Sequence, residues 1–137
     1  MPADHGQVIH INRISAGPGL PSGFPFSLAA DASGICFISG MPAIDTAGRF
    51  VPGSFSQEAD IAWRNVVAIA EASGCAPDQI AYVQCALGDM GDYGALNDWW
   101  RRQFPEPSAA PARFTFQAGA LPFGAKIEFQ AVAVSGG

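Results

Sequence analysis

Apolar and polar positions along the chain follow two periods, and each period predicts a different kind of element. In the first third of the chain, residues 8–13 alternate between apolar and polar positions, which predicts a strand, and residues 26–30 and 35–39 form two further apolar segments. The second and third of these segments flank Asp31-Ala-Ser-Gly34, a turn sequence, and so predict a hairpin. Residues 17–25, which are rich in proline and glycine, are expected to form an irregular loop.

Helical spacing predicts two helices. The first covers residues 54–73, where Ser54 and Gln57 fit a capping box and Gly74 is placed to end the helix. Its expected apolar face consists of Ala59, Ala62, Trp63, Val66, Ile69 and Ala70. The second covers residues 92–104 and ends before Pro105. Its expected apolar stripe consists of Tyr93, Leu96, Trp100 and Phe104.

Three further strands are predicted in the second half of the chain, over residues 80–87, 113–117 and 126–134, and residues 40–48 read as a loop. Strands and helices therefore follow one another as three strands, a helix, a strand, a helix and two strands. This order predicts an α+β fold in which two helices pack on one face of a single sheet. No repeat or linker interrupts the pattern, so we expect one domain over residues 1–137.

Composition adds an expectation about assembly. Hydrophobic residues make up 49% of the 137 residues, whereas charged residues make up only 14%, against roughly 25% in a typical soluble domain. So few charges cannot cover the surface of a small domain, and we expect part of that surface to be buried between copies of the chain. The net charge of −5 and the single lysine, Lys126, argue against a nucleic-acid partner.

The sequence also indicates where the protein works. No apolar run approaches the 18 to 20 or so residues that cross a bilayer, and the N-terminal residues lack the pattern of a signal peptide. The three cysteines form no CxxC spacing, so neither a disulfide framework nor a zinc site is indicated. We therefore expect a cytoplasmic protein without membrane association.

Two charged residues lie inside the otherwise apolar last strands. Alternation places Arg113, Thr115 and Gln117 on one face of their strand. It separates Glu128 from its apolar neighbours in the next strand. If the intervening Leu-Pro-Phe-Gly forms a hairpin, Arg113 lies near Glu128. The pair would then be either a structural ion pair or a site in which the guanidinium holds a substrate carboxylate beside an acid/base group.

Residues 111–134 carry a recognisable pattern: Pro-Ala-Arg, a strand, Leu-Pro-Phe-Gly, and an acidic strand that ends Ala-Val-Ala-Val. This segment resembles the C-terminal signature of the RidA/YjgF family of reactive-intermediate imine deaminases, also called endoribonuclease L-PSP. Pro25-Phe-Ser-Leu-Ala29, Ile38–Asp45 and Asp89–Tyr93 followed by Asn97 resemble other family motifs in the same order. The resemblance covers about residues 23–134.

The resemblance implies a chorismate-mutase-like fold, assembled as a homotrimer with sites in the clefts between subunits. It implies hydrolysis of 2-imino or enamino acids, which are small carboxylate-bearing substrates, to 2-oxo acids and ammonia. No metal and no organic cofactor are implied. A non-enzymatic ligand-binding or holdase-type trimer and a dedicated pathway enzyme on the same fold are the alternatives, and an endoribonuclease is disfavoured by the charge balance.

The resemblance also assigns roles by position. Arg113 matches the family residue that holds the substrate carboxylate, and Glu128 matches the acidic residue that positions water or transfers its proton. Gly40 matches a backbone position against the substrate. Asn97 matches a pocket asparagine, with an ordinary surface helix residue as the alternative interpretation. Thr115 would supply a supporting hydroxyl.

Four residues depart from the family pattern. Phe26 replaces a tyrosine, Met41 a polar residue, Phe114 a small residue, and Gln130 a residue that is often acidic. Phe26 and Met41 are expected to line the pocket, whereas alternation turns Phe114 away from Arg113. An apolar pocket predicts a preference for bulky apolar imino acids.

Overall fold

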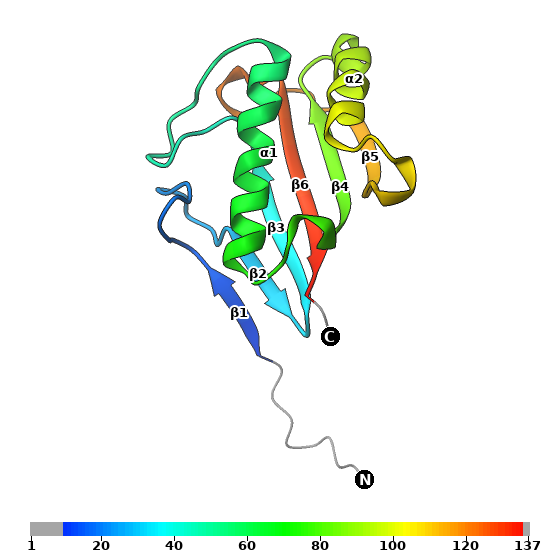
Figure 1. Ribbon diagram of the computed structural model, residues 1–137. Helices are drawn as coiled ribbons and strands as arrows, with labels where there is room; N and C mark the ends of the chain where they lie inside the picture. The colour runs from blue at the N-terminus through cyan, green and yellow to red at the C-terminus, as the bar shows by residue number, and fades with distance from the viewer. Residues whose placement is uncertain (1–9, 136–137) are drawn as a thin grey trace.

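The computed structural model of the chain describes residues 10–135 and is shown in Figure 1. Its strands and α-helices, in chain order, are β1 (Ile11–Ile14), β2 (Ala29–Ala32), β3 (Ile35–Met41), α1 (Phe55–Ala72), β4 (Ile80–Leu87), α2 (Tyr93–Gln103), β5 (Ala112–Gln117) and β6 (Ile127–Val134). The strands form a single sheet in the order β1-β2-β3-β6-β4-β5. Among these described strands, only β4 and β5 pair in parallel.

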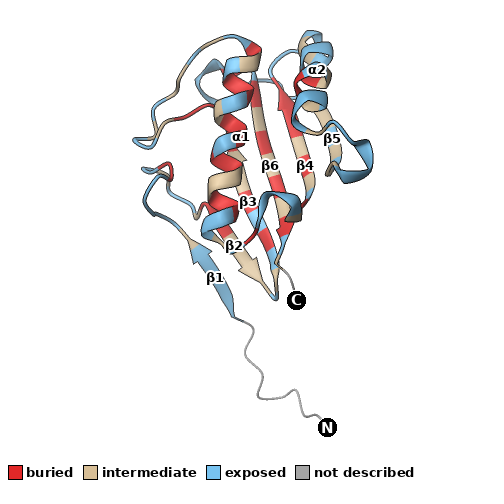
Figure 2. Cartoon of the chain, in the orientation of Figure 1, coloured by how far each residue is buried: buried red, intermediate tan, exposed pale blue. Residues whose placement is uncertain are grey.

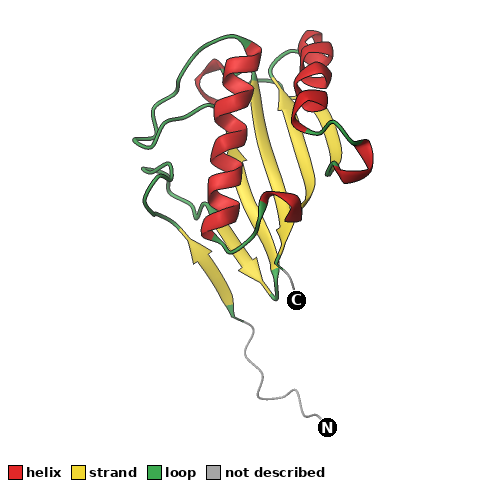
Figure 3. Cartoon of the chain, in the orientation of Figure 1, coloured by secondary structure: helices red, strands yellow, loops and turns green. Residues whose placement is uncertain are grey.

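Both helices lie on the same face of this sheet, as Figures 1 and 3 show. The predicted α+β arrangement, one mixed sheet with two helices on one face, is therefore confirmed. Within the described residues, no helix is long and apolar enough to cross a membrane.

Helix α1 matches its prediction closely because its signals are local. Ser54 is the N-cap, its hydroxyl accepts from the Gln57 backbone N–H, and the Gln57 side chain accepts from the Ser54 N–H in return. Gly74 follows the helix with a φ of +89°, the left-handed conformation in which helices commonly end. All six residues of the predicted apolar face are buried. Figure 2 shows this buried surface along α1 and the central strands beneath it.

The early strands differ from their predicted bounds. Ala32 pairs with Ile35, so the hairpin turn consists of Ser33 and Gly34 alone, both with positive φ, and β2 extends to Ala32. β3 continues to Met41 and so extends into the predicted loop of residues 40–48. Its pairing with β6 shifts register between Ile38 and Met41. β1 covers residues 11–14, and residues 8 and 9 of the predicted first strand lie outside the described residues.

The predicted hairpin between the last two strands is wrong. β6 lies between β3 and β4, and β5 pairs with the other side of β4. Helix α2 carries the chain from β4 to β5, and such a crossover joins parallel strands. The chain then crosses the end of β4 to reach β6. There the Ala118 N–H donates to the Leu87 carbonyl at 2.9 Å, and the Gly88 N–H donates to the Lys126 carbonyl at 3.1 Å.

Helix α2 is rotated relative to the predicted stripe. Leu96 and Trp99 are its buried residues, whereas Tyr93 is exposed and Trp100 is half-buried. Trp99 stacks on Phe129 of β6 with ring centroids 5.2 Å apart, and its Nε1 donates to the Asp60 carboxylate at 2.8 Å. This rotation turns the row of Tyr93, Asn97 and Trp100 toward the outer strand β5.

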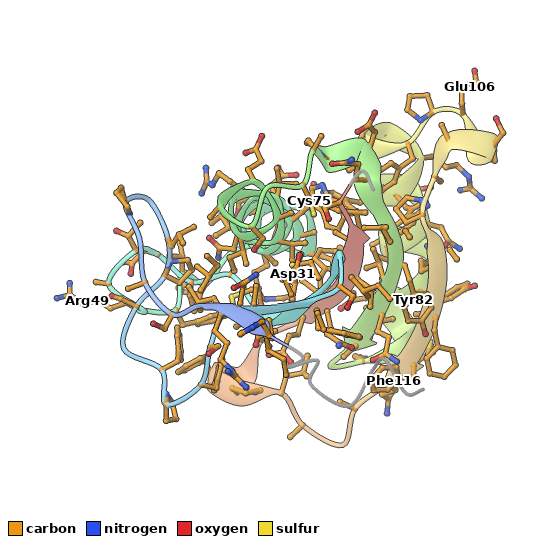
Figure 4. All side chains as sticks on the ribbon, turned by 90° about the horizontal axis from the view of Figure 1, so that it is seen from below. Asp31, Arg49, Cys75, Tyr82, Glu106 and Phe116 are labelled. Carbon is orange, nitrogen blue, oxygen red and sulfur yellow. The ribbon has the colours of Figure 1, made fainter. Side chains whose placement is uncertain are left out.

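The sheet face away from the helices is largely apolar and open. Figure 4 looks along the strands and shows the labelled Tyr82 and Phe116 on the side of the sheet away from α1. The exposed apolar side chains on this open face are Ile11 (43%), Ile35 (43%), Phe37 (49%), Phe114 (53%) and Val134 (45%).

Two buried polar side chains of α1 hold the loops at one end of the sheet. The Asn65 side-chain amide donates to the carbonyls of Ile44 and Pro42, at 2.9 and 3.3 Å. The Glu58 carboxylate accepts from the Lys126 backbone N–H at 2.9 Å and from its Nζ at 3.1 Å. These contacts position the chain after β3 and the chain before β6.

We predict that Asn65→Leu lowers the free energy of unfolding by about 1–3 kcal/mol, because the buried Ile44 carbonyl loses its partner and the Pro42 carbonyl keeps only the Ile44 N–H. Urea unfolding measures the change. Arg64→Leu, at the neighbouring exposed position, is the control and should stay within about 0.5 kcal/mol of the unmodified protein. An equal effect of the two substitutions would show that the amide does not anchor the loop.

Candidate functional site

Arg113 lies on β5 with its guanidinium beneath α2. Nη2 donates to the Asn97 side-chain oxygen at 2.7 Å. The guanidinium carbon is 5.1 Å from the centre of the Trp100 ring and 5.6 Å from that of Tyr93. Asn97, one helical turn after Tyr93, therefore contacts Arg113 directly, which argues against its interpretation as an ordinary surface residue.

Arg113 has no carboxylate partner within residues 10–135. The ion pairs there are Lys126–Glu58 and Arg101–Asp98. The expected proximity of Arg113 and Glu128 is wrong, because β4 lies between their strands and the two side chains point to opposite faces of the sheet. Two strand spacings and a three-residue offset put their backbones about 14 Å apart. A structural Arg113–Glu128 ion pair within one chain is thereby excluded.

Glu128 is half-buried beside a small apolar cavity. It makes no hydrogen bond or ion pair with the described residues, and burial raises the pKa of its carboxyl. The cavity has a volume of about 190 Å³. Its lining residues are Phe24, Phe26, Gly40, Met41, Pro42, Ile44, Pro122, Phe123 and Glu128.

Gly40 leaves room for the Glu128 carboxylate. A Cβ built on Gly40 would lie 2.8 Å from Glu128 Oε2, closer than carbon and oxygen normally approach. The expected pocket residues Phe26, Gly40 and Met41 thus gather with Glu128, although Met41 is fully buried and forms part of the pocket wall from within the core.

Sequence reasoning missed Phe24 and Phe123 as pocket residues. Phe24 stacks on Phe26 with centroids 5.4 Å apart, and Phe123 stacks on Phe50 at 5.8 Å. Their aromatic character and their proline neighbours were visible in the sequence, but neither feature shows which loops meet around Glu128.

Thr115 lies two residues after Arg113 on the same face of β5. Its hydroxyl oxygen is enclosed and has no hydrogen-bond partner among the described residues. The Cys85 thiol lies beside it. Burial raises the pKa of Cys85 to about 12, because this effect outweighs the opposing effects of the nearby Arg113 and of the Thr115 hydroxyl, which lower the pKa. Cys85 is therefore a neutral core thiol at physiological pH.

Phe114 and Gln130 lie on the open face of the sheet, away from Arg113. Gln130 lines a second hollow of about 230 Å³ that also touches Gly40 and Glu128, together with Gln84, Ala86 and Phe116. In the part of the chain that the structure describes, no group of three or more His, Cys, Asp or Glu side chains is arranged to hold a metal ion.

The predicted residues thus form two half-sites. The cationic half-site comprises Arg113, Asn97 and Thr115 on the helix side of the sheet. The acidic half-site comprises Glu128, Gly40, Phe26 and Met41 at the cavity. Each half-site holds a charge that has no counterpart among residues 10–135 of the same chain.

Comparison with known proteins supports the family resemblance. The profile of the family described as endoribonuclease L-PSP matches residues 20–135. The 2-iminobutanoate/2-iminopropanoate deaminase of Mus musculus is 34% identical over 113 residues, which cover 82% of each chain.

Solved structures agree with the fold. The E. coli YjgF gene product superposes with a TM-score of 0.79 at 27% identity, covering 90% of this chain and 98% of that one. E. coli TdcF with bound serine superposes with a TM-score of 0.80 at 26% identity, covering 91% of this chain and all of the other. The protein belongs to the endoribonuclease L-PSP family, the RidA/YjgF family of the sequence motifs.

Proposed function

We propose that this protein hydrolyses 2-imino acids to 2-oxo acids and ammonia, in a site formed where two copies of the chain meet. The observation that carries the proposal is the state of Arg113, whose guanidinium is held by Asn97 and two aromatic rings but has no carboxylate partner within residues 10–135. The activity named for the mouse relative and the serine bound to TdcF support a ligand of this class.

Arg113 would bind the substrate carboxylate. One Nη2 hydrogen bond goes to Asn97, and the remaining N–H groups make no hydrogen bond with the described residues, so a pair of parallel bonds to a carboxylate is available. The rings of Trp100 and Tyr93 restrict the guanidinium, which lowers the entropy lost on binding.

Glu128 would act on the attacking water. Its carboxylate accepts a hydrogen bond from that water, whose oxygen attacks the imine carbon while the C=N electron pair moves to nitrogen and takes up a proton. Glu128 carries the water proton to that nitrogen, which gives a carbinolamine. Glu128 then transfers the carbinolamine hydroxyl proton to the amine nitrogen, so that the C=O bond forms as the C–N bond breaks, and ammonia and the 2-oxo acid are released. A raised pKa makes Glu128 a better base than an exposed carboxylate.

The proposed assembly is a homotrimer. Its support is the open apolar sheet face, where Phe37 and Phe114 are about half exposed, together with the separation of the two half-sites. A cyclic arrangement uses two different patches of each chain at every interface, so the cationic half-site of one copy can face the acidic half-site of the next. This would complete both sites without rearranging either chain.

The family description also names an endoribonuclease, but the charges of this chain do not favour RNA. Its seven basic residues are outnumbered by twelve acidic ones, and a phosphate backbone requires clustered cations. A cytoplasmic location stays a prediction, since one relative is named as chloroplastic and another as mitochondrial.

Replacing Arg113 tests the substrate role. We predict that Arg113→Ala lowers kcat/KM for ammonia release by at least about 100-fold, because charge-assisted bonds to the carboxylate are lost. The melting temperature should change little, since Arg113 pairs with no carboxylate in the part of the chain that the structure describes. Arg102→Ala, at the exposed end of α2, is the control; an Arg113→Ala protein that unfolds or stays active would contradict the assignment.

Mixing two inactive variants tests the shared site. Light scattering of the native protein should first give the mass of a homotrimer, about three times 14.2 kDa. When Arg113→Ala and Glu128→Gln chains are unfolded and refolded together, about one quarter of the sites receive both native residues from adjacent copies. We predict recovery of about one quarter of the native activity. No recovery in a mixed trimer would show that both residues act from one chain.

The raised pKa of Glu128 predicts a link between stability and activity. A carboxyl whose pKa is higher in the folded state stabilises the fold below its unfolded pKa, and this contribution is lost as pH rises through the folded value. Glu128→Gln should therefore be inactive yet more stable than the native protein at pH 7, with the difference vanishing near pH 3.5. Urea unfolding at both values checks this, and a less stable variant at pH 7 would refute it.

A further inference from the structure

We propose that Phe123 is a specificity-determining residue that gives this site a preference for imino acids with an aromatic side chain. The inference rests on the proposed function, and it concerns a residue outside the motif positions that the sequence assigned to the site. Phe123 belongs to the Pro122–Gly124 turn, in the connection from β5 to β6.

The backbone of Phe123 adopts a conformation that does not suit its side chain. Its φ is +65° and its ψ is 9°, in the left-handed region that glycine and asparagine occupy readily and bulky residues rarely do. Gly124 follows with a φ of +68°. The turn itself would therefore form more readily with glycine or asparagine at position 123.

The ring of Phe123 contributes little to the core. It is 55% exposed, and its aromatic contact is with Phe50, whose ring lies nearly parallel at 5.8 Å. An exposed aromatic residue at an unfavourable backbone position serves neither the turn nor the core. Such an outlier points to a role for the side chain in what it contacts at the surface.

That contact is the cavity beside Glu128. Phe123 lines it from one loop, and the stacked pair Phe24 and Phe26 lines it from another, with Phe26 47% exposed. Because Glu128 lies at the same cavity, a substrate whose imine carbon is beside the carboxylate can direct its side chain toward these rings. Aromatic rings attract one another in stacked or edge-to-face arrangements beyond the burial of their area.

The size of the cavity fits a side chain and not a whole ligand. At about 190 Å³ it lies below the 300 Å³ or so of a typical complete small-molecule pocket. The carboxylate of the substrate would be bound elsewhere, at Arg113 of a neighbouring copy. Phe123 and the Phe24/Phe26 pair therefore form a subsite for the substrate side chain.

The test compares ammonia release from the imines that an amino-acid oxidase generates from phenylalanine and from alanine. The native protein should favour the phenylalanine-derived imine in kcat/KM by about 10-fold or more. Phe123→Gly should lower this ratio by about 3- to 10-fold through loss of one aromatic wall, and should raise the melting temperature because glycine suits the backbone.

Ser33→Gly is the matched control. Ser33 is exposed, has a φ of +54° in the β2–β3 turn, and does not line the cavity, so the substitution relieves a similar backbone conformation without changing the ratio. A ratio that Phe123→Gly leaves unchanged would overturn the proposal. So would a Phe123→Gly protein that loses its assembly in light scattering, which would make Phe123 an interface residue.

Calorimetric binding of phenylpyruvate and pyruvate separates this inference from the proposed function. Absence of ammonia release from every imine would refute the deaminase, while tighter binding of phenylpyruvate that Phe123→Gly weakens would still support the aromatic subsite. Ammonia release without any preference between the two imines, or equal binding of the two 2-oxo acids, would refute the subsite.

Discussion

Strand β6 lies between β3 and β4, and the side chains that it turns toward the helices are fully buried: Ile127, Phe129, Ala131 and Ala133. Burial of apolar area stabilises a fold by roughly 25 cal/mol per Å², so the strand with this continuous buried row belongs at the centre. Because successive residues alternate between faces, the same row forces Glu128 and Gln130 onto the opposite face. The central position of β6 also leaves β5 at the edge, with Arg113 beneath α2.

The electrostatics of the site follow from this placement. A cation and a carboxylate that could neutralise each other are kept on opposite faces of one sheet, about 14 Å apart in the backbone. Half-buried charges without partners are costly, and such costs are common at functional sites. The arrangement is consistent with charges that are completed by a substrate and a second copy of the chain.

Buried polar contacts keep the loops of the acidic half-site in place. Asn65 holds the carbonyls of Pro42 and Ile44, and Glu58 holds Lys126 by its backbone and its ammonium group. Both anchors come from α1, so the helix that covers the core also determines where Gly40 and Glu128 approach each other. Rigid support of this kind is what a site with defined geometry requires.

The sequence by itself determined the features that depend on neighbouring residues. Spacing along the chain is enough to predict the capping box of α1 and the bounds of β4. It also shows that Arg113 and Glu128 each lie on the face of their own strand opposite to their immediate apolar neighbours. The motif positions also predicted that Phe26, Gly40 and Met41 gather near Glu128.

Only the tertiary structure decided which strands are neighbours. Alternation shows which residues share a face, but it carries no information about which strand pairs with which. Because β6 is inserted beside β4, the expected Arg113–Glu128 contact does not form. The hydrogen-bond partner of Arg113 is Asn97 instead. The packing of Trp99 against Phe129 likewise set the rotation of α2, and the meeting of two loops brought Phe123 to the cavity. These are long-range contacts, and their energies depend on the whole core and not on local sequence.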